Sequence, residues 1–197
     1  MNKKLKFGLI AALMILLLVG AGALYRHLSA GMETAPLPGS TAATGTPDPA
    51  ATEQPKAPDF TAYDAEGNEA ALSSYLGKPI VLNFWASWCG PCRSEMPDFQ
   101  TAYELYGDEI HFVLVNMTDG ARETRETAMQ FLEEQGFTFP VLFDERSDAA
   151  IAYSVRTLPA TYFIDADGYA VAAARGMLNL ETLERGIGMI RAEAAGE

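Results

Sequence analysis

The only two cysteines of this 197-residue chain, Cys89 and Cys92, lie three positions apart. Such a pair can serve as a catalytic dithiol, as half of a metal site or as a structural crosslink. Zinc needs four ligands, and the only histidines, His27 and His111, do not complete a site with the cysteines. A crosslink across three positions closes a very small loop and therefore stabilises the fold little. The spacing favours a catalytic dithiol and no metal.

The residues around the pair predict which sulfur reacts. A strand-like run leads into Trp88 and Cys89, and Gly90 and Pro91 then open a helix. Cys89 is expected at the helix N-terminus, where free N–H groups and the helix dipole favour a thiolate. We predict that Cys89 attacks a disulfide and that Cys92, one turn further on, resolves the mixed disulfide. Trp88 is expected to cover the site and to face the substrate.

Alternating strand-like and helical segments surround the pair. Mostly apolar runs indicate buried strands at residues 79–86, 110–117 and 140–143. Helical spacing covers residues 91–106, 121–135, 147–153 and 180–194. Turn signals indicate two hairpins, at residues 64–68 and at 165–168, the second joining strands 160–165 and 169–175. This order predicts an α/β fold with a central mixed sheet and helices on both faces.

The first 28 residues differ in composition from the rest of the chain. Three lysines within the first six residues precede an uncharged apolar run at residues 7–25. As a helix this run covers roughly 28 Å, about the hydrocarbon core of a bilayer. Because the lysines precede it, the N-terminus is expected in the cytoplasm and the rest of the chain outside. A membrane anchor over residues 1–28 is favoured, and a cleaved signal peptide ending near Ala21-Gly22-Ala23 stays open.

The remaining chain divides into a predicted linker and a predicted domain. Residues 29–58 hold six prolines among Ala, Thr, Gly and Ser with no aromatic residue, which predicts a disordered tether. Residues 59–197 are long enough to bury one core. This domain has 9 Lys or Arg residues against 23 Asp or Glu residues, and the whole chain has a net charge of −12. So acidic a domain is a poor partner for nucleic acid.

The segment from Phe84 to Cys92, Phe-Trp-Ala-Ser-Trp-Cys-Gly-Pro-Cys, resembles the active site of thioredoxin-fold proteins. The wider pattern resembles the membrane-tethered TlpA/ResA-type thiol-disulfide oxidoreductases over residues 57–189. The matching motifs are APDF at 57–60, Gly77-Lys78-Pro79 and LPATYFIDADG at 158–168. Motif, order and spacing agree, which a bare Cys-x-x-Cys alone would not establish. The resemblance implies a thioredoxin-like fold with an added N-terminal hairpin.

Further site residues follow from the resemblance by position. Pro159 matches the cis-proline of the family, which lies against the cysteines and helps hold an extended substrate segment, and Leu158 would present its backbone to that segment. The family usually has Thr or Ser next, and this chain has Ala160. Glu95 matches a glutamate that tunes cysteine pKa values and moves protons; the other interpretation is a first-turn glutamate that complements the helix dipole. Asn83 stands where cytosolic thioredoxins have a buried aspartate.

The resemblance implies a protein-disulfide reductase that uses no cofactor and acts on disulfide-bearing exported proteins. The Gly-Pro dipeptide between the cysteines resembles that of thioredoxin, whose potential is about −270 mV. Such a reductant outside the membrane needs a membrane electron donor of the CcdA or DsbD type. An apocytochrome c or an exported methionine sulfoxide reductase is a candidate substrate, which implies cytochrome c biogenesis or antioxidant activity.

Two other functions stay open beside this one. A peroxiredoxin-like peroxidase wants Pro and Thr or Ser seven and three positions before its reactive cysteine, where this chain has Leu82 and Ala86. A non-redox binding module would use the cis-proline groove alone and would have no need of the intact cysteine pair. The reductase is therefore the favoured function.

Overall fold

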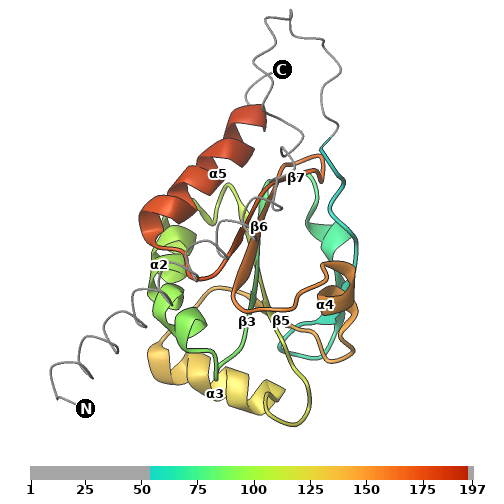
Figure 1. The fold of residues 1–197 in the computed structure, drawn as a ribbon, viewed down its shortest axis with the longest axis vertical. Coiled ribbons are helices and arrows are strands. Elements are labelled where there is room, and N and C mark those ends of the chain that lie inside the picture. The colour runs from blue at the N-terminus through green and yellow to red at the C-terminus, as the bar shows by residue number, and fades with distance from the viewer. Residues whose placement is uncertain (1–53, 195–197) are drawn as a thin grey trace, which may run out of the picture. The chain divides into compact units, whose positions relative to one another are not determined.

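The computed structural model describes residues 54–194, with side chains as far as residue 191. These residues form a seven-stranded mixed sheet in the order β2-β1-β5-β4-β3-β6-β7 (Figure 1). The strands are β1 (Thr61–Tyr63), β2 (Glu69–Ala71), β3 (Ile80–Trp85), β4 (His111–Asn116), β5 (Val141–Phe143), β6 (Ala160–Ile164) and β7 (Ala170–Arg175). The helices are η1 (Leu72–Tyr75, a 3₁₀-helix), α2 (Gly90–Tyr106), α3 (Arg125–Gln135), α4 (Asp148–Ala152) and α5 (Leu180–Ala194).

The central strand β3 is buried along its whole length. It pairs in parallel with β4 on one side and antiparallel with β6 on the other, so that Phe84 lies between Val115 and Ala160. An apolar strand with neighbours on both sides is the kind of strand that the run at residues 79–86 predicts. Its carboxyl end leads directly to the cysteines.

The two faces of the sheet carry separate apolar cores, because successive strand residues point to opposite sides. Val81 and Trp85 pack into the core beneath α2, α3 and α5. Leu82 and Phe84 pack into the core that includes residues of η1 and α4. In Figure 1, α2 and α5 lie side by side and α4 lies across the sheet from them. The predicted α/β arrangement with helices on both faces is confirmed.

Both predicted hairpins are present. Strands β1 and β2 pair antiparallel, and the turn between them has Gly67 at a φ of 87°, a conformation that favours glycine. Strands β6 and β7 pair antiparallel across the second turn, where Gly168 has a φ of 86°. The N-terminal hairpin joins the central sheet through β1, which pairs with β5.

The helix predicted at residues 121–135 begins later than the sequence pattern indicates. The expected start was near Ala121, but α3 starts at Arg125. Thr124 is the N-cap, and Thr127 completes a capping box with it. The Asp119 carboxylate accepts hydrogen bonds from the backbone N–H groups of residues 121, 122 and 123. This local turn competes with the helix and holds residues 119–123 in a loop.

The predicted boundary between linker and domain is also wrong by a few residues. Pro55 accepts a backbone hydrogen bond from Ala170 N–H at 2.9 Å, and Ala57 N–H donates to the Gly168 carbonyl at 2.9 Å. These residues fall within the predicted disordered tether, yet their backbone pairs with the β6–β7 turn region. The ordered domain therefore includes residue 55. Its pairing partners lie more than 100 positions away, so local composition could not indicate them.

Within residues 54–194, no helix has the length and apolar character needed to cross a bilayer. The predicted anchor at residues 1–28 and most of the predicted linker lie outside the described residues.

Candidate active site

The two cysteines form a disulfide at the start of α2, with their Cα atoms 5.2 Å apart. Cys89 is the N-cap residue, and its Sγ accepts a hydrogen bond from Cys92 N–H at 3.2 Å. Pro91 lies in the first helical turn, where its missing N–H leaves no broken hydrogen bond. Cys89 is 5% exposed and Cys92 is fully buried. The first sulfur thus lies at the helix N-terminus, as predicted, and the second is the more buried of the two.

A cis-proline lies at the same end of the sheet. The Leu158–Pro159 bond is cis, as the resemblance implies, and the Pro159 carbonyl accepts a hydrogen bond from Gly176 N–H at 2.9 Å. The next residue, Ala160, pairs with Phe84 near the end of β3, the strand that leads to the cysteines. Leu158 packs against the core cluster that contains both cysteines. Among the described residues, no backbone partner binds the Leu158 N–H or carbonyl.

Two large apolar side chains are exposed close to these residues along the chain. Trp88, directly before the first cysteine, is 42% exposed, and Met177, directly after Gly176, is 55% exposed. The guanidinium of Arg122 stacks on the Trp88 ring, 3.7 Å from its centroid. Exposed apolar side chains beside a reactive group are typical of a protein-binding surface. The structure thus places Trp88 at the surface, partly covered by an arginine.

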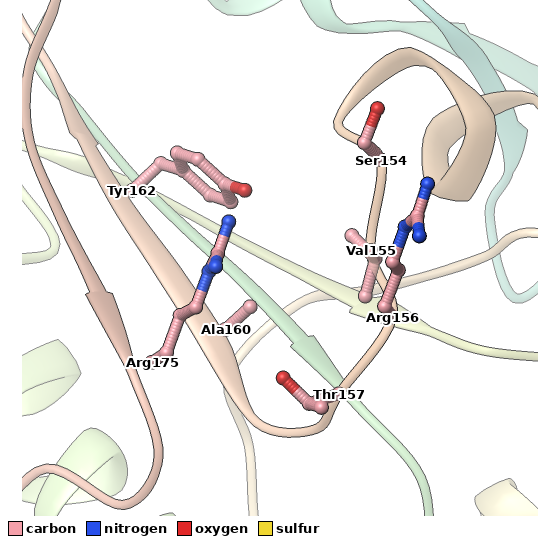
Figure 2. Close-up of a pocket in the computed structure, with 7 residues that line it drawn as sticks. All are labelled: Ser154, Val155, Arg156, Thr157, Ala160, Tyr162 and Arg175. Carbon is pink, nitrogen blue, oxygen red and sulfur yellow. The ribbon is translucent and has the colours of Figure 1, made fainter. Parts of the chain in front are cut away.

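A cavity of about 390 Å³ opens beside the cis-proline loop (Figure 2). Its walls are the loop after α4 and the ends of β6 and β7. Two arginines, a tyrosine ring and two hydroxyl side chains line it, together with two small apolar residues. The lining residues are Ser154, Val155, Arg156, Thr157, Ala160, Tyr162 and Arg175.

Glu95 is a wholly buried carboxylate, three residues after Cys92 on α2. Its Oε1 accepts a hydrogen bond from Asn83 Nδ2 at 3.0 Å, and its Oε2 accepts one from Leu178 N–H at 2.9 Å. Burial raises the pKa of Glu95 to about 7, and the two hydrogen bonds oppose that rise. No acidic residue occupies the first turn of α2, so the interpretation of Glu95 as a first-turn residue is wrong. It lies on the second turn and faces the core.

Asn83 joins Glu95 to the strand that follows the cis-proline. The Asn83 amide Nδ2 also donates to Thr161 Oγ1 at 3.0 Å, and all three residues are fully buried. The Asn83 Oδ1 atom is buried without a hydrogen-bond partner. A buried polar atom without a partner is costly and is commonly found at functional sites. Asn83 is thus a buried, uncharged hydrogen-bond partner of Glu95, at the position where the resemblance implies an aspartate in cytosolic thioredoxins.

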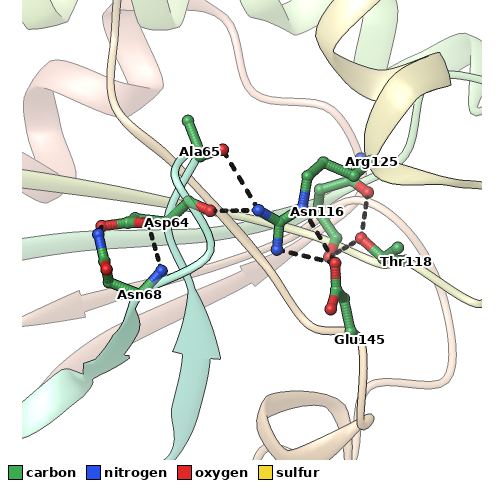
Figure 3. Close-up of polar contacts among 7 residues, drawn as sticks. All are labelled: Asp64, Ala65, Asn68, Asn116, Thr118, Arg125 and Glu145. Atoms are coloured by element: carbon green, nitrogen blue, oxygen red, sulfur yellow. Dashed lines mark hydrogen bonds and ion pairs between the residues drawn. The ribbon is translucent and has the colours of Figure 1, made fainter.

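A second buried carboxylate, Glu123, holds the loop that precedes the cysteines. It accepts hydrogen bonds from Ser87 N–H at 2.8 Å, from Ser87 Oγ at 2.7 Å and from Asn116 Nδ2 at 2.7 Å. The other amide atom, Asn116 Oδ1, accepts a hydrogen bond from Thr118 Oγ1 at 2.8 Å (Figure 3). Glu123 is fully buried. The loop after β4 is thus tied to the active-site loop two residues before Cys89.

Arg125, the first residue of α3, contacts both the N-terminal hairpin and the loop after β5. Its guanidinium donates to the carbonyls of Asp64 and Ala65 in the N-terminal hairpin turn, at 3.0 and 3.2 Å. It also pairs with the Glu145 carboxylate at 2.8 Å, as Figure 3 shows. The hairpin, α3 and the loop after β5 are held together by this one side chain.

Sequence reasoning missed Glu123, Met177 and the two arginines of the cavity. Glu123 pairs with Ser87, 36 positions earlier, so no local pattern indicates the contact. One signal for this contact was available in the sequence. Asn116 is a polar residue at the end of an apolar strand, where its side chain needs a hydrogen-bond partner. Among residues 54–191, no group of three His, Cys, Asp or Glu residues gathers as a metal site.

The fold and the disulfide together define a thioredoxin-like thiol-disulfide oxidoreductase. The AhpC/TSA family matches residues 54–173. The ResA thiol-disulfide oxidoreductase of Geobacillus kaustophilus is 36% identical over 136 residues, which cover 68% of this chain and 76% of the relative. The chain belongs to the AhpC/TSA family and, within it, to the ResA-type thiol-disulfide oxidoreductases.

Solved structures agree with this assignment. StoA from Bacillus subtilis is 26% identical, with a TM-score of 0.59, over 68% of this chain and 99% of StoA. The exposed lipoprotein thioredoxin Etrx1 of Streptococcus pneumoniae is 29% identical, with a TM-score of 0.56, over 66% of this chain and 98% of that protein. The predicted thioredoxin-like fold is confirmed.

Proposed function

We propose that this protein reduces disulfide bonds of exported proteins through Cys89 and Cys92. The observation that carries the proposal is the disulfide at the start of α2, close to a cis-proline, in a chain with ResA-type relatives. The disulfide is the product form of such a reaction, and the dithiol is the form that acts on a substrate.

The reaction is two successive thiol–disulfide exchanges. The Cys89 thiolate attacks one sulfur of the substrate disulfide, whose S–S bond breaks, and the leaving sulfur takes up a proton. A mixed disulfide then joins Cys89 to the substrate. Cys92, as a thiolate, attacks the Cys89 sulfur, and the second substrate thiol leaves. Two electrons pass from the enzyme to the substrate, and the enzyme is left with the Cys89–Cys92 disulfide.

Glu95 is proposed to take the proton from Cys92 during the second exchange. Residues three apart on a helix lie on the same side, and both side chains are fully buried. A carboxyl with a pKa of about 7 is partly ionised near neutral pH, so it can both accept and return a proton. Asn83 and the Leu178 N–H hold the carboxylate in place.

The substrate segment is proposed to lie along Leu158 and the cis-proline. The Leu158 backbone groups have no backbone partner among the described residues, so they are available to pair with an extended chain. Trp88, exposed beside Cys89, supplies apolar contact to the same segment.

The direction and location of the reaction are parts of the same proposal. The Gly-Pro dipeptide supports a reducing potential close to that of thioredoxin, which is about −270 mV. The apolar run at residues 7–25 supports an extracytoplasmic domain tethered to the membrane, and Etrx1, a relative by structure, is described as an exposed lipoprotein. A membrane donor of the CcdA or DsbD type would then return electrons to the disulfide. Substrates in cytochrome c maturation, or a methionine sulfoxide reductase, fit this position.

The proposal is tested with the purified full-length protein. After reduction, it should reduce insulin at a rate far above that of the Cys89→Ser variant, and its potential in a glutathione redox buffer should fall near that of thioredoxin. A potential near −120 mV, which is roughly that of a strongly oxidising protein, would overturn the reducing direction. Insulin left intact would overturn the reductase function altogether.

A further inference from the structure

Two arginines line the cavity beside the cis-proline loop, next to the proposed substrate path. Arg156 and Thr157 enter it from the loop after α4, and Arg175 enters it from the end of β7 (Figure 2). The arginine side chains come from opposite walls. Its volume of about 390 Å³ lies within the range of small-ligand sites.

The backbone holds this cavity against the cis-proline loop. Arg175 lies directly opposite Ala160 in the β6–β7 register, and its neighbour Gly176 donates its N–H to the Pro159 carbonyl at 2.9 Å. Arg156 precedes Leu158 by two positions in the chain. A substrate strand paired with Leu158 therefore passes close to both arginines, and its side chains alternate between the two sides of that strand.

Neither arginine has a partner of opposite charge. Arg156 and Arg175 are exposed, and among the described residues neither forms an ion pair or a side-chain hydrogen bond. Among the described residues, four arginines form ion pairs, and none of the four lines the cavity: Arg125, Arg146, Arg185 and Arg191. The Tyr162 hydroxyl donates to the Tyr153 carbonyl at 3.3 Å, and no acidic residue lines the cavity. The cavity is thus a site of positive charge on a strongly acidic domain.

We propose that this cavity binds a carboxylate side chain of the substrate protein, with Arg156 and Arg175 as its cationic partners. The inference rests on the proposed function, because it assigns the substrate strand to the cis-proline loop. The preferred substrate is a disulfide with Asp or Glu within a few residues of the attacked cysteine. Arginine suits this role because its guanidinium binds a carboxylate through two hydrogen bonds.

The arginines also select against other substrates. The domain carries 23 Asp or Glu residues against 9 Lys or Arg residues, so its negative net charge repels an acidic substrate segment. Attraction confined to the cavity therefore orients an acidic segment in a single register, and a basic segment loses that orientation. Since the ion pairs are exposed, each arginine is expected to change the rate by roughly two- to fivefold at low salt.

The test uses three peptides that each contain one disulfide and differ only at two positions beside it, which are Glu, Gln or Lys. Reduction by the reduced full-length protein is measured as kcat/KM at low salt and at about 1 M salt. The expected order is Glu, then Gln, then Lys, with roughly tenfold between the extremes at low salt and little difference at high salt. A double charge reversal, Arg156→Glu/Arg175→Glu, should invert the order.

The matched control is Arg185→Gln, which removes one exposed arginine from α5 and should leave the order and the rates unchanged. The double variant Arg156→Gln/Arg175→Gln should bring the three rates within about twofold of one another. Thermal unfolding of each variant shows that it is folded.

Equal reduction of the three peptides by the unaltered protein would overturn the inference and leave the proposed reductase function standing. Failure to reduce any of the three would overturn the reductase function, and the inference with it. A preference for Glu that survives Arg156→Glu/Arg175→Glu would also contradict the assignment.

Discussion

At the scale of single residues, the candidate site contains two buried carboxylates with different surroundings. Glu95 lies near the dithiol and accepts two hydrogen bonds, and burial raises its pKa to about 7. Glu123 lies behind the active-site loop and accepts three. The first is suited to proton transfer because its pKa is close to neutral pH. The second is suited to positioning, since its oxygens are occupied by the loop that carries the cysteines.

Glu95→Gln should change how stability depends on pH. The unfolded Glu95 titrates near 4.5 and the folded one near 7, so the unfolded state loses its proton first as pH rises. Stability is therefore lost between about pH 4.5 and 7, by about 3 kcal/mol in total. The glutamine variant lacks this loss, so its stability relative to the unaltered protein should increase by that amount from pH 4.5 to pH 8.

Urea unfolding of the oxidised proteins at the two pH values measures this difference. Glu104→Gln removes an exposed carboxylate from the same helix and serves as the control. A stability difference between Glu95→Gln and the unaltered protein that stays constant with pH would contradict a raised pKa for Glu95.

Glu123→Ala and Glu123→Gln should differ strongly. Alanine leaves Ser87 N–H and the Asn116 amide buried without an acceptor, which costs roughly 2–4 kcal/mol. Glutamine keeps one oxygen for these two donors, and its NH₂ group can donate to the Ser87 hydroxyl after that hydroxyl rotates. Guanidinium unfolding should therefore show less than half the loss for glutamine. Equal losses in the two variants would show that these hydrogen bonds do not hold the loop.

At the scale of elements, α5 is fixed on the sheet by a close approach to β6. Gly186 is buried on the sheet side of α5, and a Cβ placed there would lie 2.2 Å from ring atoms of Phe163. Gly188, two positions on, is exposed and has nothing within 4 Å of such a Cβ. The same helix thus contains one glycine that the packing requires and one that it does not.

Gly186→Ala should destabilise the protein by about 1–3 kcal/mol, because the buried Phe163 ring must shift. Gly188→Ala should stabilise it by about 0.5–1 kcal/mol, since alanine favours a helix and meets no clash. Thermal unfolding of the two variants side by side gives the comparison. Stabilisation by both substitutions would mean that α5 does not lie this close to β6.

The sequence predicted elements well where the signal is local. Apolar runs indicated β3 and β4, and turn residues such as Gly67 and Gly168 indicated both hairpins. Errors arose where distant contacts decide. Residues 55–57 read as a proline-rich tether but pair with residues more than 100 positions away. Asp119 accepts hydrogen bonds from the N–H groups that follow it, so the expected helix starts later than predicted.

The site was predictable to a similar extent. The cysteines and Pro159 were found through motif and order, and the structure shows the disulfide and the cis bond. Glu123 and the arginine-lined cavity were not found, because each depends on side chains from separate segments that only the folded sheet brings together.

At the scale of the whole molecule, a peroxiredoxin-like peroxidase is the alternative to a disulfide reductase. The positions seven and three before Cys89 hold Leu82 and Ala86, which are buried and carry no hydroxyl. Cys89 is also engaged in a disulfide with a neighbour on the same helix. These features favour exchange with protein disulfides over reaction with peroxide.

The reduced full-length protein should therefore consume hydrogen peroxide no faster than its Cys89→Ser variant, while both are supplied with the same dithiol donor. Peroxide loss is followed directly. Rapid consumption that persists in Cys92→Ser would instead support a one-cysteine peroxidase.

The central claim is that Cys89 attacks and Cys92 resolves. The most direct measurement mixes a disulfide peptide with the Cys92→Ser and Cys89→Ser variants and locates any peptide adduct by mass spectrometry. Cys92→Ser should accumulate a stable adduct on Cys89, and Cys89→Ser should form little, because Cys92 is fully buried. Equal adducts on the two variants, or an adduct only on Cys92, would contradict the account.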